Sequence, residues 1–172
     1  IPLLKKGGAE IQALYQYRAL EKLGFEVFVI TLNYDFNDLN YIKHIKLPLK
    51  SFRNPLYIFY LFKIVSKFKP DYLYTWFRQM DLFGFIYKKT FNAKWIIAER
   101  SSSRCYKNIF DFFRRIIGLN SDLVITNSQL GYTYWKNSFI LCHPKVEILQ
   151  NNYSEFINLV NKFKKENKIK SK

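Results

Sequence analysis

Apolar and polar residues alternate along the chain in two patterns: long amphipathic stretches and short, continuous apolar runs. In a helix over residues 9–23, Ala13, Tyr17 and Leu20 would share one face, which is typical of a helix that packs against a core. Gly24 then stands where a helix commonly ends. The run FEVFVITL at residues 25–32 is too continuously apolar for a half-exposed strand, so we expect a fully covered parallel strand there.

The same alternation continues to the end of the chain. It predicts further helices over residues 55–68, 80–91, 106–119 and 129–137, and further strands over residues 42–48, 71–76, 94–99, 122–127 and 145–149. Asn54 and Pro55 are the residue types favoured at the start of a helix. This β-α-β alternation predicts an α/β fold, a Rossmann-like parallel sheet with helices on both faces.

Ligands of such sheets bind at the carboxyl ends of the strands. That rule singles out Gly7-Gly8 and residues 76–81, 99–104, 127–128 and 150–152. Gly7 and Gly8 open a helix behind two lysines, where free backbone N–H groups and the positive end of the helix dipole make an anion site. A plain tight turn is the alternative explanation for the two glycines.

The other edge residues also have structural alternatives. Asn127 and Ser128 can serve as a cap for the helix that follows. Glu99 and Arg100 can form a surface ion pair, which would add little stability, and Arg78 can be a solvated loop residue. Asp71 and Asp122 start strands at the opposite edge of the sheet, so we interpret them as structural.

Composition narrows the classes of partner. The chain has 172 residues, 49% of them hydrophobic, which suits one folded domain. Its net charge of +15 favours nucleic acid, anionic lipid surfaces or phosphorylated small molecules. Cys105 and Cys142 lack a CxxC spacing, which fits a reducing compartment better than a disulfide framework. Together with His44 and His143 they do not form a metal-binding pattern. No signal peptide or membrane-spanning segment is visible.

Five segments, taken in order, resemble one known family. They are GGAEIQALYQYRALEKLGFEVFVITL, KPDYLYTW, WIIAERSS, SDLVITNSQLGYTYWKN and KVEILQNNYS. Together they are similar to the N-terminal domain of GT-B glycosyltransferases of the family-4-like kind, over residues 4–153. Asn152 departs from that family's usual glycine, and the chain starts at the end of the family's first strand.

The resemblance implies a retaining glycosyltransferase that moves a sugar from a nucleotide-sugar donor to a glycan or lipid-linked acceptor in surface polysaccharide or glycoconjugate synthesis. It implies an acceptor-side domain over residues 1–153 and a basic linker over residues 154–172, leading to a C-terminal, donor-binding domain absent from this sequence. We therefore expect the chain alone to be inactive. The family's fold needs no obligatory metal, and we expect no cofactor other than the nucleotide-sugar substrate.

The resemblance also turns the edge segments into expected substrate-binding residues. These are Gly7, Gly8, Glu10, Arg78, Glu99, Arg100, Ser101, Asn127, Ser128 and Asn151. Many relatives have a histidine near the second edge loop, but none occurs there in this chain, so no catalytic residue can be named.

Acceptors of such enzymes are often lipid-linked at the inner membrane face. Residues 51–69 and 106–117 mix aromatic with basic residues as membrane-surface helices do, although core packing explains the aromatics equally well. We expect a cytoplasmic protein that binds an anionic membrane surface peripherally, chiefly through residues 55–68 with Lys63 and Lys67. The alternative is a basic α/β domain that binds nucleic acid or phosphorylated ligands without catalysis. We favour no nucleic-acid partner, because the basic residues are scattered and match no such motif.

Overall fold

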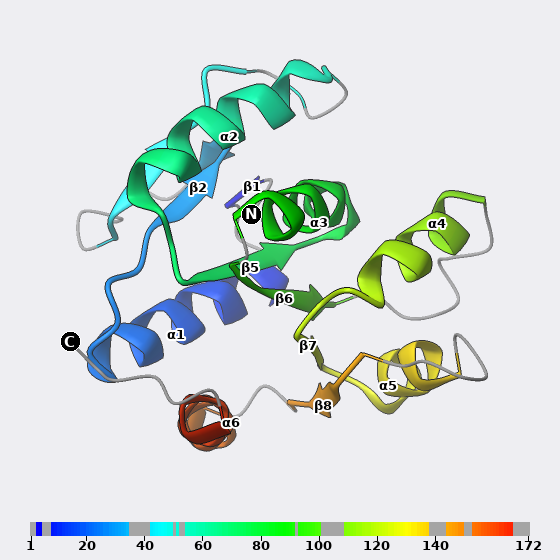
Figure 1. The fold of residues 1–172 in the computed structure, drawn as a ribbon. Helices are drawn as coiled ribbons and strands as arrows, with labels where there is room; N and C mark the ends of the chain where they lie inside the picture. The colour runs from blue at the N-terminus through cyan, green and yellow to red at the C-terminus, as the bar shows by residue number, and fades with distance from the viewer. Residues whose placement is uncertain are drawn as a thin grey trace.

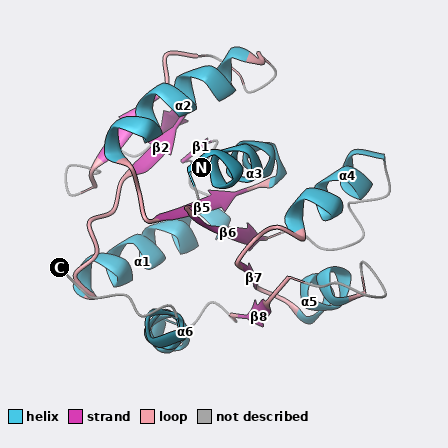
Figure 2. Cartoon of the chain, viewed as in Figure 1, coloured by secondary structure: helices cyan, strands magenta, loops and turns pink. Residues whose placement is uncertain are grey.

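The computed structural model describes residues 3–4, 8–34, 42–49, 51, 54–91, 93–100, 109–137, 144–149 and 153–166 (Figure 1). Strands and helices alternate through most of the chain, as Figure 2 shows. The strands are β1 Leu3–Leu4, β2 Val29–Thr31, β3 Asn33–Tyr34, β4 His44–Lys46, β5 Tyr72–Trp76, β6 Lys94–Glu99, β7 Leu123–Thr126 and β8 Val146–Ile148. The helices are α1 Gly8–Lys22, α2 Leu56–Phe68, α3 Arg78–Phe91, α4 Ile109–Gly118, α5 Gln129–Lys136 and α6 Tyr153–Glu166.

Every strand pairing in the described part of the chain is parallel. Strands β5, β6, β7 and β8 form a four-stranded sheet in that order, while β1 pairs with β3 and β2 with β4. Parallel neighbours require a crossover connection, and helices α3, α4 and α5 supply the crossovers of the larger sheet. The predicted fold class, a Rossmann-like parallel sheet with helices on both faces, is confirmed.

The two faces of the four-stranded sheet carry different helices. Helices α1 and α6 lie on one side of the sheet, and α3, α4 and α5 lie on the other (Figure 1). Successive strand residues point to opposite faces. In β6, for example, Ala98 belongs to the cluster that includes Ala13 of α1, while Ile97 packs with Trp135 of α5.

The α1–α6 face is closed by apolar packing. Its core holds Leu123 and Ile125 of β7 together with Ala19 of α1 and Phe156 and Phe163 of α6. Residues 154–166, expected to be a basic linker, therefore form most of a helix that packs on the domain. The helix has a simple cause: Phe156 and Phe163 lie seven residues apart on one face of α6, and both side chains are buried there. That residues 154–172 lead to a further domain stays a prediction.

The strand expected over residues 25–32 is shorter than its apolar sequence suggested. Only Val29–Thr31 forms β2, which pairs in parallel with β4 as expected. The prediction that residues 25–32 are fully covered was wrong, because Phe28 is 37% exposed. Its ring packs against that of Phe68, with 4.4 Å between the ring centres. Glu26 is also exposed and pairs with Lys43 at 3.0 Å.

Candidate functional site

The carboxyl ends of β5 and β6 lie beneath the first half of α1. Trp76, the last residue of β5, is 3% exposed and packs with Ala13 of α1 and Ala98 of β6. The first half of α1 therefore lies close to the edge of the sheet at which ligands of parallel α/β proteins bind. Gly8 and Glu10, two of the expected binding residues, lie in the first turn of this helix.

Arg100 follows β6 and lies on the same side of the sheet as α1. Its guanidinium carbon stands 4.7 Å from the centre of the Trp76 ring, within the range of a cation–π contact. All three guanidinium nitrogens are shielded from solvent and have no hydrogen-bond partner among the described residues. Buried polar groups are nearly always hydrogen-bonded, and charged ones above all. Arg100 therefore offers unused donors beside the ligand edge.

Two further polar side chains surround Arg100. The Tyr74 hydroxyl donates a hydrogen bond to Gln16 Oε1 at 2.9 Å, and Gln16 Nε2 has no acceptor within the described part of the chain. Burial raises the pKa of Tyr74, and the nearby Arg100 charge opposes that rise. Among the described residues, the guanidinium meets no acceptor with standard hydrogen-bond geometry, although the Tyr74 hydroxyl lies close to it.

The turn between β5 and α3 has an unfavourable backbone conformation. Phe77 has φ 67°, in the left-handed region that side chains other than glycine rarely adopt. Such residues cluster at functional sites, because the surrounding structure must hold them in place. Phe77 directly precedes the exposed Arg78, which begins α3 at this edge of the sheet.

Glu99 points away from Arg100, into the opposite face of the sheet. Its side chain is 1% exposed. Arg114 Nη1 of α4 donates to Glu99 Oε2 at 2.6 Å, and Trp135 Nε1 of α5 donates to the same oxygen at 3.2 Å. These two hydrogen bonds anchor Glu99 to α4 and α5, and so hold the end of β6 just before Arg100.

Asp81 of α3 completes this buried charge network. Arg114 Nε donates to Asp81 Oδ2 at 2.6 Å, and Thr75 Oγ1 donates to Asp81 Oδ1 at 2.8 Å. Burial raises the pKa of Asp81, and the Arg114 guanidinium opposes the rise. Sequence reasoning missed both residues. Asp81 ends one of the segments it singled out, but nothing in the sequence marks Arg114 as the partner of two carboxylates.

Close packing explains the glycine at position 131 but not the glycine at position 8. A Cβ at Gly131 of α5 would lie 3.2 Å from Thr126 Cβ and 3.5 Å from Glu99 Cγ, so packing around Glu99 requires a small residue there. A Cβ at Gly8 would meet no atom within 4 Å, and Gly8 is exposed. Protein packing therefore does not explain Gly8.

The remaining expected residues divide into two groups. Ser128 caps α5, since its side chain accepts a hydrogen bond from the Gly131 backbone N–H at 3.2 Å, and Asn127 is half-buried just before it. The capping alternative thus describes Ser128. Gly7, Ser101 and Asn151 lie outside the described residues.

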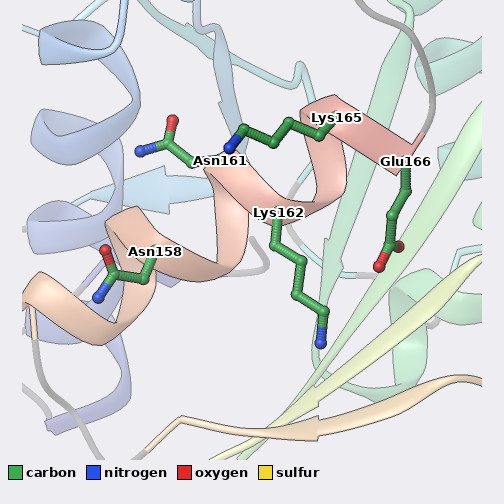
Figure 3. A pocket seen from close by; sticks show the side chains of 5 residues that line it. All are labelled: Asn158, Asn161, Lys162, Lys165 and Glu166. Atoms are coloured by element: carbon green, nitrogen blue, oxygen red, sulfur yellow. The ribbon is translucent and has the colours of Figure 1, made fainter.

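Two other features of the described chain lie apart from this edge. A surface hollow on α6 is lined by Asn158, Asn161, Lys162, Lys165 and Glu166 (Figure 3). Glu166 also pairs with Lys145, which precedes β8. A search of the described residues finds no group of His, Cys, Asp and Glu that could hold a metal ion.

The sheet order and the helices on both faces define an α/β domain with a Rossmann-like parallel sheet. The family model for Glycosyltransferase Family 4 matches residues 6–151, and the chain belongs to that family. The resemblance seen in the sequence is thereby confirmed.

Solved structures agree on the fold. One structure of sucrose-phosphate synthase from Thermosynechococcus elongatus matches with a TM-score of 0.71 and 15% identity, covering 98% of this chain and 99% of that one. Another structure of the same enzyme matches with a TM-score of 0.66 and 18% identity over 86% of this chain. This chain spans 43% of the latter's length. No curated protein matches this sequence. Within the described residues, no helix is long and apolar enough to cross a bilayer.

Proposed function

We propose that this chain forms the acceptor-side half of a retaining glycosyltransferase. The enzyme transfers a hexose-type sugar from a nucleotide-sugar donor to a glycan or lipid-linked acceptor in the synthesis of surface polysaccharide or glycoconjugate. Membership of glycosyltransferase family 4 over residues 6–151 carries this proposal. The donor-binding half belongs to a second domain of the same enzyme, and the protein works in the cytoplasm.

The arrangement of Arg100 supports an anionic substrate at the carboxyl edge. Its guanidinium is held by Trp76 on one side, and its nitrogens have no partner among the described residues. A group fixed in this way needs little reorganisation when a phosphate or another developing negative charge arrives. Arg100 would then bind an anionic group of the donor or acceptor, and Glu99 acts as a positioning residue behind it.

Gly8 and the first turn of α1 support the same site. The N–H groups of a helix's first turn favour negative charge, and glycine lets a ligand approach the backbone closely. Among the described residues, no atom lies within 4 Å of a Cβ built at Gly8, which is consistent with substrate approaching the backbone there. Glu10, in the same turn, would bind a hydroxyl group of the transferred sugar or the acceptor.

Activity of the full-length enzyme, in which this domain is joined to its donor-binding half, tests the proposal. We would incubate it with a panel of nucleoside-diphosphate sugars and a water-soluble sugar acceptor, and follow release of the nucleoside diphosphate. One donor should be consumed, and NMR of the product should show the anomeric configuration of the donor. Absence of turnover with every donor, combined with salt-sensitive binding to RNA, would favour the alternative of a non-catalytic polyanion-binding domain.

An Arg100→Gln variant tests the residue assignment. We expect kcat/KM to fall at least about tenfold, equivalent to roughly 1.4 kcal/mol of transition-state stabilisation. The matched control is Arg18→Gln, a change of the same size on α1, where Arg18 is exposed away from this edge. Equal activity of the two variants would remove Arg100 from the site.

A further inference from the structure

Helix α4 directs polar residues toward the protein and most of its apolar residues toward solvent. Its polar residues Asp111 and Arg114 are each 5% exposed and face the protein. Five of its six apolar residues face outward instead, while Ile117 packs against the core. The exposed fractions are 61% for Ile109, 75% for Phe110, 45% for Phe112, 56% for Phe113 and 38% for Ile116. These five residues are called the α4 apolar face below.

Polar contacts fix this orientation. Arg114 is bound to both Asp81 and Glu99, and Asp111 accepts a hydrogen bond from the Tyr134 hydroxyl. A Cβ at Gly118 would lie 2.5 Å from the Trp135 ring, so the helix also packs there through a residue without a side chain. Rotating α4 to bury its rings would break both ion pairs in a buried setting, which is strongly unfavourable.

The three helices on this side of the sheet carry surface charge of one sign. The only acidic residues of α3, α4 and α5 are Asp81 and Asp111, and both are buried and paired. The charges of these helices that reach the surface are all basic: Arg78, Lys88, Lys89, Arg115 and Lys136. Asp122, which directly precedes β7, forms ion pairs with Lys88 and Lys94.

We infer that the α4 apolar face docks on an anionic lipid surface. Phenylalanine and isoleucine side chains with basic neighbours are the composition of helices that lie in the interface of a bilayer. Two copies of this face would bring like charges together, which disfavours a symmetric dimer. A helix of ten residues is only ~15 Å long, so it lies in the interface and does not span the bilayer.

The inference moves the docking site from the helix that the sequence pattern favoured. In α2, Lys63 and Lys67 are exposed as expected, but the apolar residues Tyr57, Leu61 and Val65 are buried in the core. Phe59 is the main exposed ring of α2, at 63%. Helix α4 instead follows Arg100 along the chain, beyond the carboxyl edge of the sheet. The inference rests on the proposed function in one respect, because a docked α4 would bring that edge to a lipid-linked acceptor.

Vesicle binding of the native protein tests this inference without any sugar transfer. We would compare sedimentation with vesicles of phosphatidylcholine alone and of phosphatidylcholine mixed with phosphatidylglycerol. The mixed vesicles should bind the protein, added salt should weaken that binding, and neutral vesicles should bind it poorly. The double change Phe110→Ser and Phe113→Ser should reduce binding to the mixed vesicles at least about tenfold.

The matched control is Phe59→Ser, which removes an equally exposed ring from α2 and should leave binding within about twofold of the native value. A Phe113→Trp variant adds a direct signal, since its fluorescence should shift to the blue with mixed vesicles only. The inference is overturned if the native protein ignores lipid charge, if the double variant binds as well as the native protein, or if Phe59→Ser causes the same loss. It is also overturned if light scattering shows a native dimer that the double variant converts to monomers. Turnover with the water-soluble acceptor reports on the proposed function separately.

Discussion

The two faces of the four-stranded sheet are built on opposite principles. On the α1–α6 face, apolar residues such as Ile125 and Phe156 point inward and the charged residues of the helices point outward. On the α3–α5 face, an ion network of Asp81, Glu99 and Arg114 is buried, while Phe110 of α4 is 75% exposed. The same sheet thus has one face closed by the hydrophobic effect and one held in part by charge.

The difference shows how the site and the surface depend on each other. Glu99 and Arg100 are neighbours in sequence, but they point to opposite faces because side chains alternate along a strand and its extension. The network that holds Glu99 also turns the rings of α4 toward solvent. Substrate binding on one face and surface docking on the other therefore share the end of β6.

Removing the Arg114 guanidinium from the buried ion network should give the largest change in stability. An Arg114→Leu variant would leave Asp81 and Glu99 buried without their common partner. We expect unfolding free energy to fall by about 3–5 kcal/mol, measured by urea denaturation. The control Arg115→Leu, which breaks a looser pair with Asp111 at 3.7 Å, should cost less than about 1 kcal/mol. Equal losses would show that the network adds nothing special.

Removing one ring from each face should separate core from surface. Phe156 is 3% exposed, so Phe156→Ala should lower unfolding free energy by about 3 kcal/mol. Phe113 is 56% exposed, so Phe113→Ala should change it by less than about 0.5 kcal/mol. Thermal melting of the two variants checks both values. A large loss for Phe113→Ala would mean that the α4 rings pack against the protein.

A glycine on the α3–α5 face offers a third comparison. A Cβ at Gly84 of α3 would lie 2.2 Å from Trp95 Nε1, so Gly84→Ala must displace a buried indole. We expect a loss of about 1–3 kcal/mol in chemical denaturation, although alanine favours helix more than glycine does. An unchanged or raised stability would contradict the close packing of α3 on β6.

The smallest expected effect depends on pH. Burial and the hydrogen bond to Asp111 raise the pKa of Tyr134 above its ordinary value of 10.0. The folded protein therefore keeps this proton where the unfolded chain has lost it, and its stability falls as pH rises above about 10. Compared with Tyr134→Phe, the native protein should hold a constant advantage of about 1 kcal/mol below that pH, and the advantage should shrink above it. Denaturation of both proteins across this pH range measures the difference, and an advantage that grew would contradict the assignment.

The sequence predicted the strands and crossover helices of the larger sheet better than the orientation of α4 or the helix α6 over residues 153–166. The strand expected over residues 94–99 is confirmed in full as β6, and the other helices and strands of the larger sheet lie within a few residues of their expected bounds. The orientation of α4 could not be predicted, because apolar periodicity alone would place its rings inward. The deciding contacts join Arg114 to residues 33 and 15 positions away.

The site was predicted in outline only. The rule for parallel sheets located Gly8, Arg100 and Ser128 at one edge, and the structure places them at the ends of strands or the starts of helices there. The sequence could not distinguish their surroundings. Arg100 has free donors among the described residues, Ser128 is committed to a cap, and Glu99 is enclosed. Which side a residue takes at the end of a strand depends on register, and only the fold reveals it.

The central claim is that substrate meets the backbone at the start of α1, and turnover of a Gly8→Val variant of the full-length enzyme tests it most directly. The first atom of the new side chain would lie more than 4 Å from every atom of the described residues, so melting temperature should stay close to that of the native protein. If the donor or acceptor lies there, kcat/KM should fall at least ~100-fold, equivalent to roughly 2.7 kcal/mol of transition-state stabilisation. Near-native turnover in this normally folded variant would contradict the claim and return Gly8 to the role of a simple turn residue.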